Sequence, residues 1–198
     1  MHYDMSPLRL GILASGTGSN FAAIAQAISD KNLNAQIKTL IYNNPNAGVA
    51  RKAEQWKIPA VLLNHHQFGR REDLDHAIME TMTAYQVDWV IMAGWMRCVT
   101  SVLLDAFPQR VLNIHPSLLP SFPGLHAVKQ ALAAGVTITG CTVHHVVPAV
   151  DSGPIVMQAA VPIMPNDTEA TLHERIHVQE HIIYPRAIML AATALSRN

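Results

Sequence analysis

The stretch Leu8-Arg-Leu-Gly-Ile-Leu-Ala14, followed directly by Ser15-Gly-Thr-Gly-Ser-Asn20, decides the fold of this chain. The first part is a short apolar run bounded by a turn signal, which is typical of a buried strand. The second part is a loop of small residues that leads into an apolar-periodic segment, Ser19–Ser29, where we predict a helix. A strand, a tight glycine loop and a helix in this order begin a parallel α/β sheet.

The same alternation of strand and helix patterns continues along the first two-thirds of the chain. We predict strands at Leu8–Ala14, Gln36–Tyr42, Ala60–Leu63, Asp88–Ala93 and Arg110–Ile114. We predict helices at Ser19–Ser29, Ala47–Trp56, Arg71–Tyr85, Val99–Phe107 and Ala127–Ala134. The tail predicts two successive strands, Ile138–Val147 and Ile155–Ile163, and a closing helix from Glu169 to about Leu195 that is interrupted at Pro185. This pattern predicts a single α/β domain over residues 1–198, with a Rossmann-like, doubly wound and mostly parallel sheet.

Composition limits the partners that the chain can have. Of its 198 residues, 49% are hydrophobic and 14% are charged, against roughly 25% charged residues in ordinary soluble domains. Lys plus Arg equals Asp plus Glu at 14 each, so we expect neither a nucleic-acid nor a membrane partner. The N-terminus lacks a signal-peptide pattern, and Cys98 and Cys141 form no CxxC pair. We therefore expect a cytoplasmic protein with reduced cysteines.

The glycine loop after the first strand is suited to a phosphate group, because backbone N–H groups and the positive end of a helix meet there. It is not a P-loop, since Thr17-Gly18 stands where Lys-Ser/Thr is required. It is not a dinucleotide fingerprint either, since Phe21 takes the third glycine position. A smaller phosphate ester remains, and Gly18 would allow its close approach because it has no Cβ. The alternative is a plain glycine turn with Ser19 or Asn20 as N-cap.

Polar side chains end two of the predicted strands. The segments Asn113-Ile-His-Pro-Ser-Leu-Leu-Pro120 and Val150-Asp-Ser-Gly-Pro-Ile155 each combine a strand end with a turn rich in Pro, Gly or Ser. An open α/β sheet presents such residues to a crevice at its strand ends. Asn113, His115 and Asp151 together can polarise a carbonyl, move a proton and orient an imidazole, as acyl transfer to an amine requires. Singly, each also fits a structural role in a turn or in the core.

The segment His173-Glu-Arg-Ile-His177 matches the HExxH signature of zinc proteases. No Asp or Glu follows Glu180 to supply a third ligand, so we expect no bound metal. This helix is predicted instead to offer His177 and Glu180 to a substrate. Most other histidines, including the pair His144-His145, are expected to be surface or satisfied core residues.

Three motifs taken together resemble the phosphoribosylglycinamide formyltransferase family: Ser15–Asn20, Asn113–His126 and Val150–Ile155. The likeness extends from Leu8 to about Pro185. It implies the formyltransferase fold and transfer of a formyl group from 10-formyltetrahydrofolate, as co-substrate, to the amine of glycinamide ribonucleotide in purine (IMP) biosynthesis. The implied partners are these small molecules, with no metal and a possible homodimer.

The resemblance also implies a role for particular residues. Asn113, His115 and Asp151 are expected to be catalytic. Gly18, Ser19 and Asn20 are expected to bind the acceptor phosphate, and His177 and Glu180 its ribose and amine end. The residues expected to line the folate site are Arg71, Met96, Arg97, Cys98, Val99, Asn113, Val147, Pro148, Ala149, Val150 and Asp151.

Two alternatives to this function stay open at the level of sequence. A formyltetrahydrofolate hydrolase would use a similar core and release formate without an acceptor. A non-catalytic folate-binding module would use the same fold without turnover.

Overall fold

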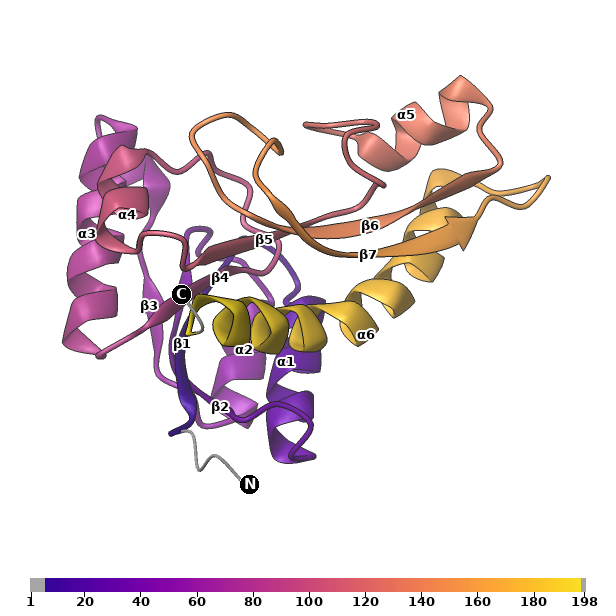
Figure 1. The fold of residues 1–198 in the computed structure, drawn as a ribbon. Coiled ribbons are helices and arrows are strands. Elements are labelled where there is room, and N and C mark those ends of the chain that lie inside the picture. The colour runs from indigo at the N-terminus through magenta and orange to yellow at the C-terminus, as the bar shows by residue number, and fades with distance from the viewer. Residues whose placement is uncertain (1–5, 197–198) are drawn as a thin grey trace.

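The fold is built on one sheet of seven strands in the order β3-β2-β1-β4-β5-β6-β7. It is seen in a computed structural model that describes residues 6–196 (Figure 1). The strands are β1 (Leu8–Ala14), β2 (Ala35–Tyr42), β3 (Ala60–Leu62), β4 (Trp89–Met92), β5 (Val111–His115), β6 (Ile138–His145) and β7 (Ile155–Pro162). The helices are α1 (Ser19–Ser29), α2 (Val49–Gln55), α3 (Arg71–Ala84), α4 (Ser101–Ala106), α5 (Ala127–Ala134) and α6 (Glu169–Leu195), with a 3₁₀ turn η1 at His65–Gln67.

Strand direction places the candidate site at one end of the sheet. β1 to β5 are parallel, and β6 and β7 are antiparallel to their neighbours. The chain winds outward from β1 to β3, and then returns to place β4 on the other side of β1. Loops leaving β1 and β4 therefore diverge at the carboxyl ends of these strands, which is where open α/β sheets form a crevice.

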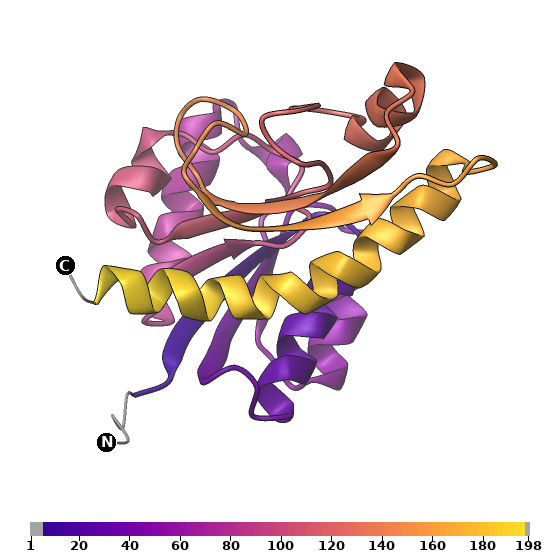
Figure 2. The ribbon, with the colours of Figure 1, turned by 45° about the vertical axis from the view of Figure 1, so that its right-hand side comes forward.

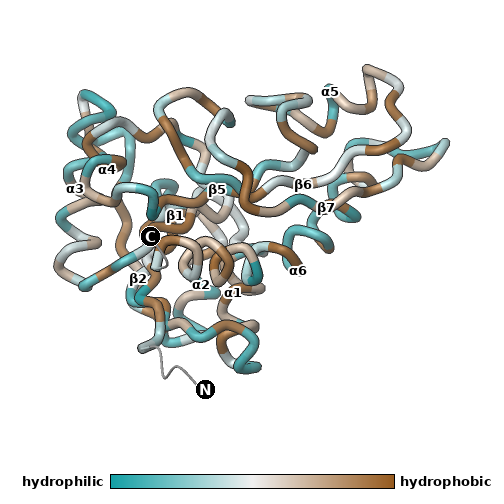
Figure 3. Tube along the Cα trace, in the orientation of Figure 1, coloured by the Kyte–Doolittle hydropathy of each residue, from teal (hydrophilic) through white to brown (hydrophobic). Residues whose placement is uncertain are grey.

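Two apolar layers hold the sheet between its helices. On one face, buried residues such as Leu10 and Ile12 of β1 pack with α1 and with α6, which lies along the sheet (Figure 2). On the other face, Leu13 packs with α3 and α4. Successive side chains of a strand point to opposite faces, so β1 supplies both layers. Hydrophobic residues accordingly concentrate in the central strands, whereas α3 shows more hydrophilic residues (Figure 3).

Gly11 explains how α3 reaches the sheet closely. A Cβ at this position would lie 2.1 Å from Met82 Sδ, so the end of the Met82 side chain would have to move before a larger residue could fit. Met82 is fully buried in that layer. Gly11 thus makes room for the side chain of Met82, and it lies outside the glycine loop that follows β1.

The predicted elements agree with the structure in type and order, and most bounds differ by one or two residues. One prediction is wrong: α6 runs from Glu169 to Leu195 without an interruption at Pro185. Pro185 is buried within the apolar layer, and the neighbouring Tyr184 donates its hydroxyl proton to the carbonyls of Met92 and Leu112. Tertiary packing on both sides therefore holds the helix although proline removes one backbone hydrogen bond. No helix within residues 6–196 has the length and apolar character needed to cross a membrane.

Candidate active site

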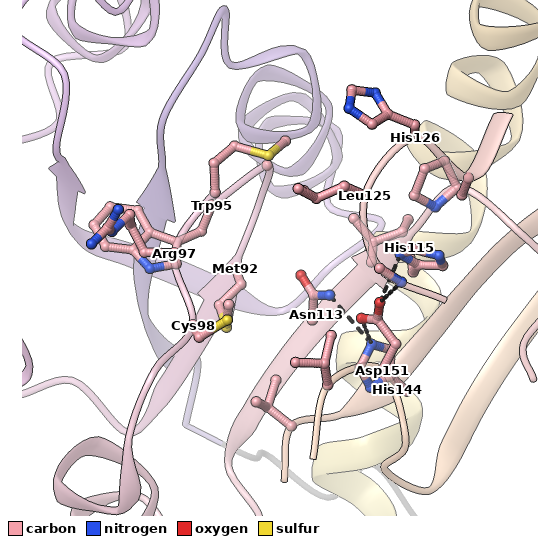
Figure 4. A pocket seen from close by; sticks show the side chains of 18 of the residues that line it. Met92, Trp95, Arg97, Cys98, Asn113, His115, Leu125, His126, His144 and Asp151 are labelled. Carbon is pink, nitrogen blue, oxygen red and sulfur yellow. Dashed lines mark hydrogen bonds and ion pairs between the residues drawn. The ribbon is translucent and has the colours of Figure 1, made fainter. Parts of the chain in front are cut away.

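Asn113, His115 and Asp151 meet at the end of β5. Asn113 and His115 are two residues apart on β5, so their side chains share one face of the sheet. Asp151 reaches them from the connection between β6 and β7, with its Oδ2 3.3 Å from His115 Nδ1 (Figure 4). The structure thus brings together residues that are 36 positions apart in the sequence.

Asp151 is held by more than His115. Its Oδ2 accepts a hydrogen bond of 2.8 Å from Gly124 N, and its Oδ1 lies 3.6 Å from His144 Nε2. Burial alone would raise the pKa of this carboxyl group, but the hydrogen bonds and the nearby imidazoles outweigh burial and lower the pKa. Asp151 is therefore a carboxylate at neutral pH. Its φ of 49° is a left-handed conformation, which Asp tolerates better than most residues.

His115 has an acceptor at each ring nitrogen. Nδ1 faces Asp151, and Nε2 lies 2.8 Å from the carbonyl oxygen of Phe122. Each ring nitrogen of His115 therefore has an oxygen atom within reach, which fixes the orientation of the ring. Phe122 and His126 have φ of 55° and 59°, so the segment that supplies this carbonyl adopts strained backbone close to the cluster.

His144 belongs to the same cluster, although it was predicted to be a surface or satisfied core residue. It is 2% exposed and lies directly across the β5–β6 ladder from Asn113. Its Nε2 is 3.3 Å from Asn113 Nδ2, and its Nδ1 is 3.0 Å from the carbonyl oxygen of His145. An uncharged His144 accepts from the Asn113 amide, whereas a protonated one donates to Asp151. His144 therefore helps to orient both of these residues.

A cavity of about 690 Å³ opens beside this cluster. Its wall includes the following residues that we expected at the folate site: Met96, Arg97, Cys98, Val99, Asn113, Val147, Pro148, Val150 and Asp151. Arg71 begins α3 and Ala149 is exposed, and neither lines the cavity. The folate role of these two residues stays a prediction. The loop Met96–Val99 and the β6–β7 connection thus form two walls of one cavity.

A second cavity, of about 270 Å³, lies at the N-terminus of α1. Gly18, Ser19 and Asn20 line it, together with His177 and Glu180 from α6. The N-cap of α1 is Gly18, not Ser19 or Asn20. As a glycine, Gly18 makes no side-chain cap hydrogen bond, and an anion could accept from the first N–H groups of α1 instead. The five residues expected to bind the acceptor therefore lie together.

Gly18 has a second reason to be glycine, besides the close approach of a phosphate that we predict. Its φ is 74°, and a Cβ there would lie 2.4 Å from Val49 Cγ2. Val49 is buried at the start of α2. A side chain at position 18 would therefore displace α2, and the close approach of a phosphate ester at Gly18 stays a prediction.

Glu180 is a buried carboxyl group in the second cavity. It is 3% exposed, accepts a 2.8 Å hydrogen bond from Asn20 Nδ2, and lies 3.8 Å from His177 Nε2. Burial raises the pKa of Glu180 against the opposing effects of Asn20, His173 and His115. The His173 and His177 rings lie close, with centroids 4.1 Å apart. Residues 6–196 contain no group of three or more His, Cys, Asp or Glu side chains placed to hold a metal ion.

The two cavities are adjacent and their loops are joined. Gly94, Met96, Ile114, Pro116 and His173 line both of them. Ser15 N donates to the carbonyl oxygen of Gly94 at 3.0 Å, and Met96 N donates to Ser15 Oγ at 2.9 Å. The loops after β1 and β4 therefore form one continuous wall between the cavities.

Comparison with known proteins agrees with this arrangement. The formyl transferase family model matches residues 8–188, which is most of the chain. The chain belongs to the formyl transferase family. Among members of this family, the phosphoribosylglycinamide formyltransferase of Bacillus subtilis is 39% identical over 91% of this chain and 92% of its own length. The family and the fold class predicted from the sequence are both confirmed.

Other formyl transferases show the same similarity. The glycinamide ribonucleotide transformylase 1 of Symbiobacterium toebii superimposes with a TM-score of 0.92 at 42% identity, covering 95% of this chain and 89% of that one. The human trifunctional purine biosynthetic protein adenosine-3 is 42% identical over 96% of this chain. This chain spans only 19% of that human protein, so it corresponds to one part of it.

Proposed function

We propose that this chain transfers the formyl group of 10-formyltetrahydrofolate to the amine of N1-(5-phospho-D-ribosyl)glycinamide in de novo purine biosynthesis. The observation that carries the proposal is the position of Asn113, His115 and Asp151, which meet beside a large cavity that adjoins a smaller one at a helix N-terminus. Such an arrangement suits a reaction between two bound substrates, because holding them together supplies much of the rate.

The larger cavity supports binding of the formyl donor. Its volume of about 690 Å³ lies within the usual range for small-molecule sites. Met96 and Val99 on one side and Val147 and Pro148 on the other give it apolar walls suited to a flat ring system. Asn113 and Asp151 place polar groups at one end, where the formyl group would lie next to the second cavity.

The smaller cavity supports binding of the acceptor. The uncapped N–H groups at Ser19 and Asn20 and the positive end of α1 suit a phosphate monoester. Glu180 and His177 lie across this cavity and can accept hydrogen bonds from ribose hydroxyls. An acceptor that is anchored by its phosphate at α1 would extend its other end toward the larger cavity.

The chemistry follows from the groups at the junction. Attack of the acceptor amine on the formyl carbon develops negative charge on the formyl oxygen, and Asn113 Nδ2 and a protonated His115 can stabilise that charge. N10 of the folate must gain a proton before it can leave. Asp151, paired with His115, can stabilise the charged imidazole and transfer protons through water.

One assay tests this proposal. Purified protein is incubated with the formyl donor, with and without the acceptor, and free tetrahydrofolate is followed. Tetrahydrofolate should form only when the acceptor is present. Equal release without the acceptor would establish a hydrolase, and no release under either condition would leave a folate-binding module.

A further inference from the structure

His173 occupies a special place between the two cavities. Among the histidines of residues 6–196 that line either cavity, it is the one that lines both. His173 lies in the first part of α6. The other residues that line both cavities include Ile114 and Pro116, which flank His115 in the sequence. His173 therefore lies where the two cavities adjoin, which is where the acceptor amine would meet the formyl group in the function proposed above.

The reaction needs a group that takes a proton from the attacking amine. In the cluster, His115 directs Nδ1 at Asp151 and Nε2 at the Phe122 carbonyl. His144 directs Nδ1 at the His145 carbonyl and Nε2 toward Asn113 and Asp151. The ring nitrogens of His115 and His144 are thus directed at groups other than the acceptor amine.

We propose that His173 is a further catalytic residue that accepts the proton of the acceptor amine, an inference that rests on the formyl transfer proposed above. As the amine nitrogen bonds to the formyl carbon, the carbonyl electron pair moves to oxygen, and one N–H proton passes to the lone pair of His173. The carbonyl then re-forms and the bond between carbon and N10 breaks. N10 gains a proton from the His115–Asp151 side, which solvent restores, and His173 releases its proton to solvent.

The surroundings of His173 favour an uncharged ring. Burial and the nearby His177 lower the pKa of His173, against the smaller opposing effects of Glu180 and Glu169. An imidazole with a lowered pKa is uncharged at neutral pH and can act as a base. From the other elements around the two cavities, the titratable groups are Arg97, Cys98, His115, His126, His144 and Asp151.

The test compares three variants with the wild-type chain. His173→Gln should lower kcat by about 10²–10⁴ at neutral pH, the usual range for a general base, and leave the acceptor KM within a few-fold. The wild-type rate should fall as the pH drops and His173 becomes protonated, and the variant should lose this acid limb. Added imidazole should restore turnover to His173→Ala. His181→Gln is the matched control, because His181 lies on the same helix and lines neither cavity.

Several results would overturn the inference. A His173→Gln variant with a raised acceptor KM and unchanged kcat would make His173 a binding contact only. An unchanged pH profile, or a His173→Ala variant that does not respond to imidazole, would exclude a base at this position. If the wild-type chain transfers no formyl group, the proposed function itself is contradicted. If the wild-type chain transfers it normally and the His173→Gln variant is fully active, only the role of His173 is contradicted.

Discussion

Replacement of Asp151 by Asn tests whether the carboxylate stabilises charge on His115 during transfer. The Asn side chain can keep the hydrogen bond from Gly124 N through its oxygen. That oxygen would still face His115 Nδ1, and the amide nitrogen would take the place of Oδ1 beside His144 Nε2. The substitution therefore removes the negative charge while it retains the shape of the site.

The magnitude follows from the distance between the two groups. Two unit charges 3.3 Å apart attract by about 5 kcal/mol at an effective dielectric constant of roughly 20. Each factor of ten in rate corresponds to about 1.4 kcal/mol, so this attraction sets an upper limit near four decades. We expect Asp151→Asn to lower kcat by about 10²–10⁴, with modest changes in both KM values.

The assay is a double-mutant cycle on kcat. His115→Ala should cost about as much as Asp151→Asn, and the double variant should be little slower than the slower single variant, because both remove the same interaction. Thermal unfolding of each variant serves as the control for folding. Fully multiplicative losses would refute the reasoning, since they would show that Asp151 acts independently of His115.

Three further predictions concern the neighbouring groups. Gly18→Ala should lower the free energy of unfolding by about 2–4 kcal/mol, because of the positive φ and the contact with Val49. Gly69→Ala is the control: its Cβ would lie in open space, so the free energy of unfolding should change by less than about 1 kcal/mol, and urea unfolding measures both variants. Asn113→Ala should raise the kinetic barrier by about 3–4 kcal/mol, measured as kcat, through loss of a donor to the formyl oxygen, and a loss below tenfold would contradict that role. Prolonged chelation should leave transfer unchanged, and activity that is lost and then restored by zinc would contradict our reading of the HExxH segment.

Much of the fold could be predicted from the sequence because it rests on local patterns. β1 and α1 have the bounds that we predicted, since an apolar run, a glycine loop and a helical period mark them within a few residues of each other. The interruption at Pro185 was wrong because the stability of α6 there comes from buried neighbours. Packing of this kind is not visible in a local pattern.

The candidate site was predictable in part. Asn113 and His115 stand at the end of an apolar strand, and that position alone predicts a place at the crevice. His144 was missed because its role depends on the antiparallel register that sets it opposite Asn113, and a single sequence does not give that register. The contact between Gly18 and Val49 could not be predicted for a similar reason, since Val49 lies far along the chain and meets Gly18 only in the folded protein.

The most direct test of the account follows the formyl group itself. The donor is labelled with ¹³C at its formyl carbon and incubated with the protein and the acceptor, and ¹³C NMR records where the label goes. We predict that the label moves to the amine nitrogen of the acceptor, that none appears as formate, and that His115→Ala slows this movement by at least about 10²-fold. Label released as formate, or transferred at the wild-type rate by His115→Ala, would contradict it.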